Sequence, residues 1–154
     1  MRFTALLAAF AIALAAITCV SLFGQDSQTE KKVISSDELK TICSDVAALA
    51  AQAVELRKKS AGMSSRDIVN EAERLRRRLE AVVLTIASTR PAQSDQRAAM
   101  LLAMGTKGAE LALWHYIYGV MANSPRSNEH GDVLLKAAAA QIDAARQMLF
   151  SGNM

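Results

Sequence analysis

Aliphatic residues recur three or four positions apart over residues 36–60, which is the spacing of one face of an α-helix. This stripe consists of Leu39, Ile42, Val46, Leu49, Ala53 and Leu56. Residues 65–88 repeat the pattern with Ile68, Ala72, Leu75, Leu79, Val82 and Ile86. Because so few residues separate the two segments, we predict two long amphipathic helices that pack antiparallel to each other.

Both predicted helices begin with a capping sequence. Ser35 is followed three residues later by Glu38, and Ser64 is followed in the same way by Asp67. In this motif the serine hydroxyl accepts a hydrogen bond from the third backbone N–H of the helix, and the acidic side chain accepts one from the backbone of the serine. Gly62 lies between the two segments, where a left-handed residue is expected to close the first helix.

A third helix is predicted over residues 94–122, after the break that Pro91 introduces. Gly105 and Gly108 lie inside it, and each costs about 1 kcal/mol relative to alanine in a helix. Either the helix is continuous and the glycines allow a neighbouring helix to come close, or the helix breaks near Gly105. We favour the continuous helix.

Residues 123–125 are expected to end the third helix. A fourth helix is predicted over residues 128–150, capped by Ser127 or Asn128. Its apolar stripe consists of Leu135, Ala138, Ile142, Ala145 and Leu149. Four helices of similar length with short connections predict an all-α fold, an antiparallel four-helix bundle over residues 35–152.

The N-terminus has the pattern of an export signal. Arg2 precedes an uncharged apolar run, and we predict that residues 1–24 are a signal peptide that is removed. Two alternatives stay open: residues 5–23 are just long enough to remain as a membrane anchor, or Cys19 carries a lipid. Residues 25–34 have no apolar period and are predicted to be a flexible linker. The mature chain is therefore expected in the periplasm or outside the cell.

Charge and cysteine usage narrow the class of partner. The chain carries a net charge of +3 at pH 7, and loss of Arg2 with the signal peptide leaves about +2. This balance is too weak to predict binding to nucleic acid or to acidic lipid. Cys43 is the only cysteine after residue 24, so no internal disulfide is expected. Its place beside Leu39 and Val46 favours a buried free thiol, with a bridge to a second copy or a partner as the alternative.

The sequence lacks the spacings that metal, haem and catalytic sites require. His115, His130 and Cys43 are the only histidines and cysteine after residue 24, and no two of them stand four positions apart. Cys-x-x-Cys, the Glu-x-x-His pair of a bundle di-metal site and a glycine-rich phosphate loop are all missing from the sequence. We therefore predict no enzymatic activity, no cofactor and no metal site.

Two clusters are candidates for binding a partner protein. The aromatic cluster lies in the third predicted helix and consists of Trp114, His115, Tyr116 and Tyr118. Apolar side chains face more than one side there, which is typical either of the most buried helix or of a surface for a second protein or a second copy. The arginine cluster lies on the polar face of the second helix and consists of Arg74, Arg77 and Arg78. Arg76 is assigned to the same polar face, where the spacings of Glu73 from Arg77 and of Arg76 from Glu80 predict ion pairs along a solvated helix. The arginine cluster is either part of this solvated face or a second contact for the partner.

Function is predicted only by class. The outline resembles that of short exported helical proteins of Gram-negative bacteria, a heterogeneous group that implies no particular activity. We expect a non-enzymatic, protein-binding factor of the bacterial cell envelope: an inhibitor, an immunity-type neutraliser of a toxin, or an accessory protein. The alternative is a carrier that holds a small apolar ligand between the helices. A third interpretation is a structural component that associates with copies of itself.

Overall fold

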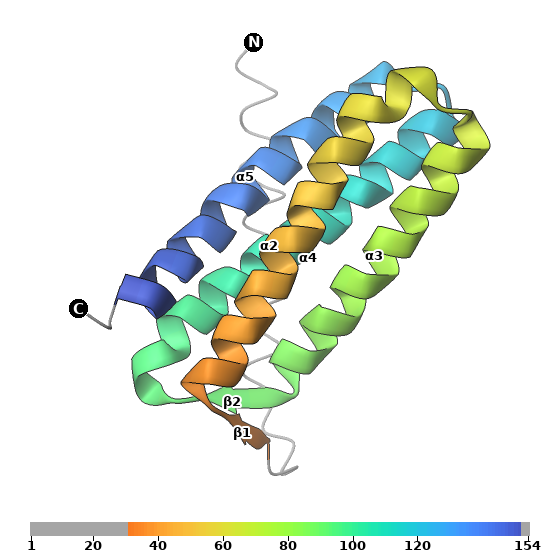
Figure 1. Cartoon of the computed structure of the whole chain (residues 1–154). Coiled ribbons are helices and arrows are strands. Elements are labelled where there is room, and N and C mark those ends of the chain that lie inside the picture. Colours follow the sequence, from red (N-terminus) through yellow and green to blue (C-terminus); the bar gives the residue numbers. More distant parts are fainter. Residues whose placement is uncertain (1–30, 152–154) are drawn as a thin grey trace.

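The computed structural model describes residues 31–151, and four long helices make up most of this part of the chain. They are α2 (Ser36–Lys59), α3 (Ser65–Ala87), α4 (Gln96–Met121) and α5 (Pro125–Phe150) (Figure 1). The predicted all-α class is confirmed. The predicted signal peptide, residues 1–24, lies outside the described residues, and so does most of the predicted linker.

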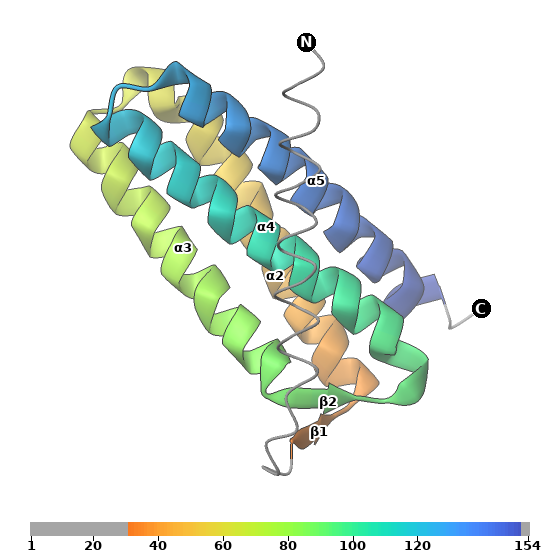
Figure 2. The ribbon, with the colours of Figure 1, turned by 180° about the vertical axis from the view of Figure 1, so that it is seen from behind.

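The four helices lie side by side along their lengths, with α4 between α3 and α5 (Figure 2). The stripes predicted for α2 and α3 face the core, where Leu39, Val46, Leu75 and Leu79 are buried. Leu102 of α4 and Ile142 of α5 pack with the first two of these, and Leu113 of α4 packs with the other two. The core therefore extends along the helices, and every helix contributes its apolar stripe to it.

The capping box predicted at Ser35 is complete, whereas at Ser64 only the serine half of the predicted box forms. Ser35 Oγ accepts a hydrogen bond from the backbone N–H of Glu38 at 3.2 Å, and the Glu38 carboxylate accepts one from the backbone N–H of Ser35 at 2.9 Å. Ser64 Oγ accepts a hydrogen bond from the backbone N–H of Asp67 at 3.2 Å. These bonds satisfy N–H groups that have no partner inside the helix.

The prediction that Gly62 adopts a left-handed conformation is wrong. It belongs to a short 3-10 turn, η1 (Ser60–Gly62), and no glycine among residues 31–151 has a positive φ. The turn is closed by a hydrogen bond of 3.2 Å from the backbone N–H of Met63 to the carbonyl oxygen of Ser60. Because the tighter turn already satisfies a free carbonyl at the end of α2, no left-handed residue is required.

The predicted start of the fourth helix is also wrong, since α5 begins at Pro125 and not at Asn128. Proline suits the first helical position because its missing N–H would have no partner there and its φ is already helical. The cap is Ser124, whose hydroxyl accepts a hydrogen bond from the backbone N–H of Ser127. Asn123 takes the positive φ, 47°, that reverses the chain after α4.

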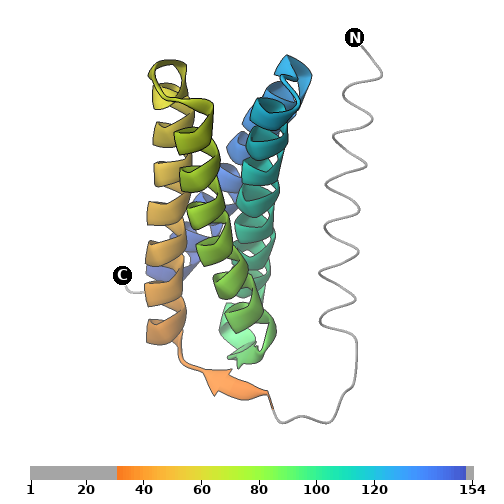
Figure 3. The same cartoon turned by 90° about the vertical axis from the view of Figure 1, so that its right-hand side faces the viewer.

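The end of the predicted linker is ordered, which the sequence analysis did not foresee. Strand β1 (Lys32–Ile34) pairs in parallel with β2 (Thr89–Pro91). Figure 3 shows β1 at the end of the molecule where α2 begins. Ile34 is buried in the same cluster as Leu39, so an apolar contact holds the strand to the start of α2. Beyond β2, a 3-10 turn, η2 (Gln93–Asp95), precedes α4.

Helix α4 is continuous through both of its inner glycines, as predicted. A Cβ atom on Gly105 would lie 2.7 Å from Ile142 Cγ1 and 3.0 Å from the carbonyl oxygen of Ala138. Real Cβ atoms essentially never show the first distance, and the second is tighter than most real Cβ contacts, so glycine lets α5 approach this closely. The predicted close approach is therefore confirmed, and the neighbour is α5.

Candidate functional site

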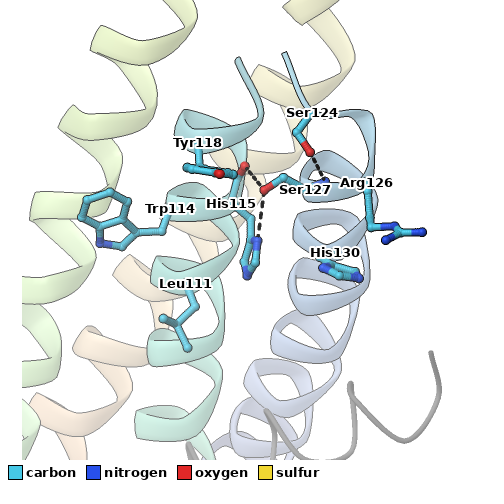
Figure 4. Close-up of a pocket in the computed structure, with 8 residues that line it drawn as sticks. All are labelled: Leu111, Trp114, His115, Tyr118, Ser124, Arg126, Ser127 and His130. Atoms are coloured by element: carbon cyan, nitrogen blue, oxygen red, sulfur yellow. Dashed lines mark hydrogen bonds between the residues drawn. The ribbon is translucent and has the colours of Figure 1, made fainter. Parts of the chain in front are cut away.

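A groove of about 440 Å³ lies between α4 and α5, close to the turn that joins them (Figure 4). Helix α4 lines it with Leu111, Trp114, His115 and Tyr118. The beginning of α5 and its cap line it with Ser124, Arg126, Ser127 and His130. We refer to these residues together as the aromatic groove.

The helical period explains which aromatic side chains reach the groove. Residues 111, 114, 115 and 118 share one face of α4 because a turn contains 3.6 residues. Leu113 and Tyr116 lie on the opposite face and are buried in the core. Trp114 and Tyr118 remain 50% and 60% exposed. Helix α4 thus has a buried face and an exposed aromatic face. The two faces together explain why apolar side chains occur on more than one side of this helix.

Ser127 fixes the position of His115 within the groove. Its hydroxyl donates a hydrogen bond of 2.9 Å to the carbonyl oxygen of His115, and the same Oγ lies 3.2 Å from His115 Nδ1. The hydroxyl has only one proton, so its oxygen accepts a hydrogen bond from Nδ1–H. His115 Nε2 is consequently left with a free lone pair. Burial lowers the pKa of His115, and the neighbouring His130 lowers it further, which favours the neutral ring.

His130 is brought next to His115 by the turn between α4 and α5. The two ring centroids are 5.7 Å apart, and the ring planes stand at 89° (Figure 4). The residues are fifteen positions apart in the chain, so the sequence analysis, which tested only spacings within one helix, missed the pair. The signal that would have revealed it is the predicted turn between the two helices, which folds the start of α5 back along the end of α4.

Arg76 of α3 holds the other side of Trp114. Its guanidinium carbon lies 5.3 Å from the centre of a Trp114 ring, within the range of a cation–π contact. The same guanidinium donates hydrogen bonds of 2.8 and 3.0 Å to Glu73 and one of 3.2 Å to Glu80. It also reaches the buried carboxylate of Glu110, which pairs with Lys107 as well. Arg76 therefore restricts the movement of Trp114 and compensates a buried charge.

The sequence analysis placed Arg76 on the solvated face of α3, and this was wrong. Its side chain is only 13% exposed. Its spacing from Glu80 predicted an ion pair along the helix, and that pair is present. The ion pair of Arg76 with Glu73 was not predicted. The contacts with Glu110 and Trp114 join α3 to α4, so no local spacing predicts them.

Glu73 is expected to make stability depend on pH in the acid range. Hydrogen bonds from Arg76 and Arg77 lower the pKa of Glu73 from 4.5 to about 2. A carboxylate with a lowered folded pKa stabilises the fold above its unfolded pKa, and this contribution is lost as the pH falls through the folded value. Glu73→Gln is expected to lose about 1 kcal/mol of unfolding free energy near neutral pH, because solvent screens the pairs. Urea unfolding of both proteins measures the difference, which should vanish near pH 2; a difference that persists there would contradict this assignment.

Two members of the arginine cluster are paired within their own helix. Arg74 donates hydrogen bonds to Glu71, at 2.9 Å from its Nε, and Arg77 donates one of 2.9 Å to Glu73. Arg78 is exposed and has no ion pair within residues 31–151. The charges of Arg74 and Arg77 are therefore balanced on α3, and they lie outside the lining of the aromatic groove.

Tyr116, the remaining aromatic candidate, is buried and ties three helices together. Its hydroxyl donates a hydrogen bond of 2.8 Å to Asp132 Oδ1 in α5. Arg57 of α2 donates two further bonds to the Asp132 carboxylate, at 2.9 and 3.2 Å. Burial raises the pKa of Tyr116, and the bond to Asp132 raises it further, so the hydroxyl stays protonated. Tyr116 supports the groove from the inside and does not reach its surface.

The groove combines apolar and aromatic side chains of α4 with polar side chains from the start of α5. Among residues 31–151, no three His, Cys, Asp or Glu side chains come together in a way that could hold a metal ion. None of the helices in this range is both long and apolar enough to cross a membrane. No protein-family model, curated protein or solved structure shows significant similarity to the chain. Function is therefore inferred from the groove itself.

Proposed function

We propose that the chain is an exported, non-enzymatic helical protein that binds another protein of the bacterial cell envelope through the aromatic groove. The observation that carries the proposal is the exposure of two large aromatic side chains, Trp114 and Tyr118, on one face of α4. Met121 continues the same face and is also exposed. Trp, Tyr and Met are enriched in protein interfaces, where Trp and Tyr often supply much of the binding energy.

We further propose that residues 35–152 form an antiparallel four-helix bundle and that residues 1–24 are a signal peptide that is removed. Short connections between successive helices support the antiparallel order, because a short turn can only return the chain beside the helix it leaves. The charged and apolar pattern of the N-terminus supports export to the periplasm or the medium. Fractionation of cells and the intact mass of the purified chain test both the location and the cleavage.

Rigid aromatic groups support a binding role for the groove. Arg76 restrains Trp114 from the side of α3, and the bond between His115 and Ser127 restrains the wall between the helices. Side chains that are already ordered lose little entropy on binding, so more of the contact energy appears as affinity. Arg126 and His130 add polar groups at the rim, which resembles the division of known interfaces into an apolar centre and a polar edge.

Ser127 and His115 are the two groove residues that most resemble a catalytic pair. Their geometry supports binding of a partner protein and not catalysis. A catalytic serine gives its proton to the histidine that activates it. Here the hydroxyl proton goes to the carbonyl oxygen of His115, and the serine side chain is buried. The pair orders the helix turn, which is consistent with an inhibitor, an immunity-type neutraliser or an accessory factor.

A carrier of a small apolar ligand is the second candidate function. The observation that favours it is the volume of the groove, about 440 Å³, which falls in the range of small-molecule sites. Native mass spectrometry of the protein purified from the envelope distinguishes the two candidates. A co-purifying small molecule that is lost after Trp114→Ala would favour the carrier, and a co-purifying protein would favour the first proposal.

The double substitution Trp114→Ala and Tyr118→Ala is expected to abolish partner capture from envelope extracts. Loss of one such interface aromatic commonly costs about 2 kcal/mol of binding free energy or more. The matched control is Leu84→Ala on α3, because Leu84 is 64% exposed and does not line the groove. The control should capture the same proteins as the wild type, and circular dichroism should show all three proteins equally helical. If the double variant captured the same proteins as the wild type, the aromatic groove would not be the binding surface.

A further inference from the structure

The pairing of His115 with His130 is a feature of the groove that the proposed function does not use. One imidazole comes from the last turns of α4 and the other from the first turns of α5, so the turn between the helices fixes their separation. Neither ring forms an ion pair within the described residues, and the only polar contact of either ring is that of His115 Nδ1 with Ser127. Two adjacent imidazoles are a common nitrogen donor set for transition metals.

The spacing of the rings suits two ligands of one metal ion. At metal–nitrogen distances of about 2.0–2.1 Å, the ion lies about 3.2 Å from the centroid of each imidazole, which puts the two centroids roughly 5–6 Å apart for angles near tetrahedral. The observed centroid separation is 5.7 Å. His130 is exposed, and a rotation about its side-chain bonds would direct a ring nitrogen toward an ion held by His115.

The hydrogen bond from His115 to Ser127 already selects the tautomer that a metal ion needs. Metal-binding histidines usually donate the N–H of one ring nitrogen to a protein oxygen, which orients the ring and leaves the other nitrogen free to bind. In this chain Nδ1–H is donated to Ser127 Oγ, and Nε2 carries the free lone pair. Ser127, in the first turn of α5, thus orients the His115 ring for binding.

We propose that His115 and His130 together bind a divalent transition-metal ion of the Zn²⁺, Ni²⁺ or Cu²⁺ class, with water in the remaining coordination positions. Imidazole nitrogen suits these ions, whereas Ca²⁺ and Mg²⁺ require oxygen ligands. No carboxylate lines the groove, which disfavours the harder cations. A bound ion would join the end of α4 to the start of α5 and add a positive charge to the rim of the groove.

Calorimetric titration of the full-length chain with Zn²⁺ tests the site without any partner. We expect one ion per chain, with an affinity that falls at least tenfold in His115→Gln and, separately, in His130→Gln. Ser127→Ala should weaken binding by about tenfold, because loss of the group that orients a metal-binding histidine typically has an effect of this size. Arg126→Gln is the matched control, since Arg126 lines the same groove but offers no free lone pair; it should bind at least as tightly as the wild type.

A second measurement keeps the proposal testable if a His115 variant folds poorly. His130 is exposed, so His130→Gln is expected to fold normally. Electron paramagnetic resonance of the wild-type chain with Cu²⁺ should show coupling to two imidazole nitrogens, and to at most one in His130→Gln. Zn²⁺ binding that is unchanged in His130→Gln, or a Cu²⁺ spectrum without imidazole nitrogen coupling, would overturn the proposal. These measurements contain no partner protein. A failure of the metal-site proposal is therefore distinct from a failure of the proposed protein binding.

Discussion

Replacing Leu79 with alanine is expected to lower the free energy of unfolding by about 2–5 kcal/mol. Leu79 lies on the apolar stripe of α3, is fully buried, and packs in the same cluster as Leu49 and Leu113. The substitution removes buried methyl groups and leaves a cavity that rigid helices fill only in part. Urea unfolding followed by circular dichroism gives the difference directly.

Leu84→Ala is the matched control for this substitution because it lies on the same helix but is largely exposed. Its expected effect is within about 0.5 kcal/mol, as for most surface positions. A near-zero effect at Leu79, or equal effects at both positions, would mean that the stripe of α3 does not form the core.

Replacing Gly131 with alanine is expected to destabilise the protein by about 2 kcal/mol, although alanine is the better helix former by about 1 kcal/mol. A Cβ atom on Gly131 would lie 2.5 Å from Tyr116 Cε1 and 3.1 Å from the carbonyl oxygen of Ala112. The Tyr116 ring has little freedom to move because its hydroxyl is bonded to Asp132. The added methyl group therefore forces α4 and α5 apart or breaks that hydrogen bond.

The same substitution at Gly62, Gly62→Ala, is expected to stabilise the protein, in contrast to Gly131→Ala. No atom lies within 4 Å of a Cβ placed on Gly62, and its φ is not positive. Alanine there should stabilise the protein by about 0.4–1 kcal/mol, because it restricts the unfolded chain. Melting temperatures of the two variants should move in opposite directions. A rise in both would contradict the close packing of α4 against α5, and a fall in both would contradict the open surroundings of Gly62.

Features that depend on neighbours along the chain could be predicted from the sequence. The stripes of α2 and α3, the caps at Ser35 and Ser64 and the continuity of α4 all follow from spacings of a few residues, and all are present. The start of α5 was missed for a local reason as well. Pro125 was interpreted as the end of one helix, whereas at this position it opens the next.

Features that join distant segments could not be predicted in this way. Ile34 was assigned to a flexible linker because only the folded chain places it against the start of α2. Arg76 was assigned to the solvated face because its contacts with Glu110 and Trp114 cross from α3 to α4. The aromatic cluster was correctly located along the chain, but periodicity alone did not divide it into exposed Trp114 and buried Tyr116.

The groove also changes which residues are candidates for partner binding. Arg74 and Arg77 are neutralised within α3, and Tyr116 supports the core. Trp114 and Tyr118 remain as the proposed central contacts, and Arg126 and His130 of α5 become candidates beside them because they line the same groove. A partner that fits this surface is expected to bring an apolar side chain to the wall formed by Trp114 and polar groups to the rim.

The most direct test of this account is photo-crosslinking in intact cells from a position in the groove. Replacing Tyr118 with p-benzoylphenylalanine keeps an exposed aromatic group at the proposed contact, and the same replacement at Leu84 provides an equally exposed control on α3. The account predicts one discrete crosslinked protein from position 118 and none from position 84. No crosslink at position 118, or the same products from both positions, would contradict a partner bound at the aromatic groove.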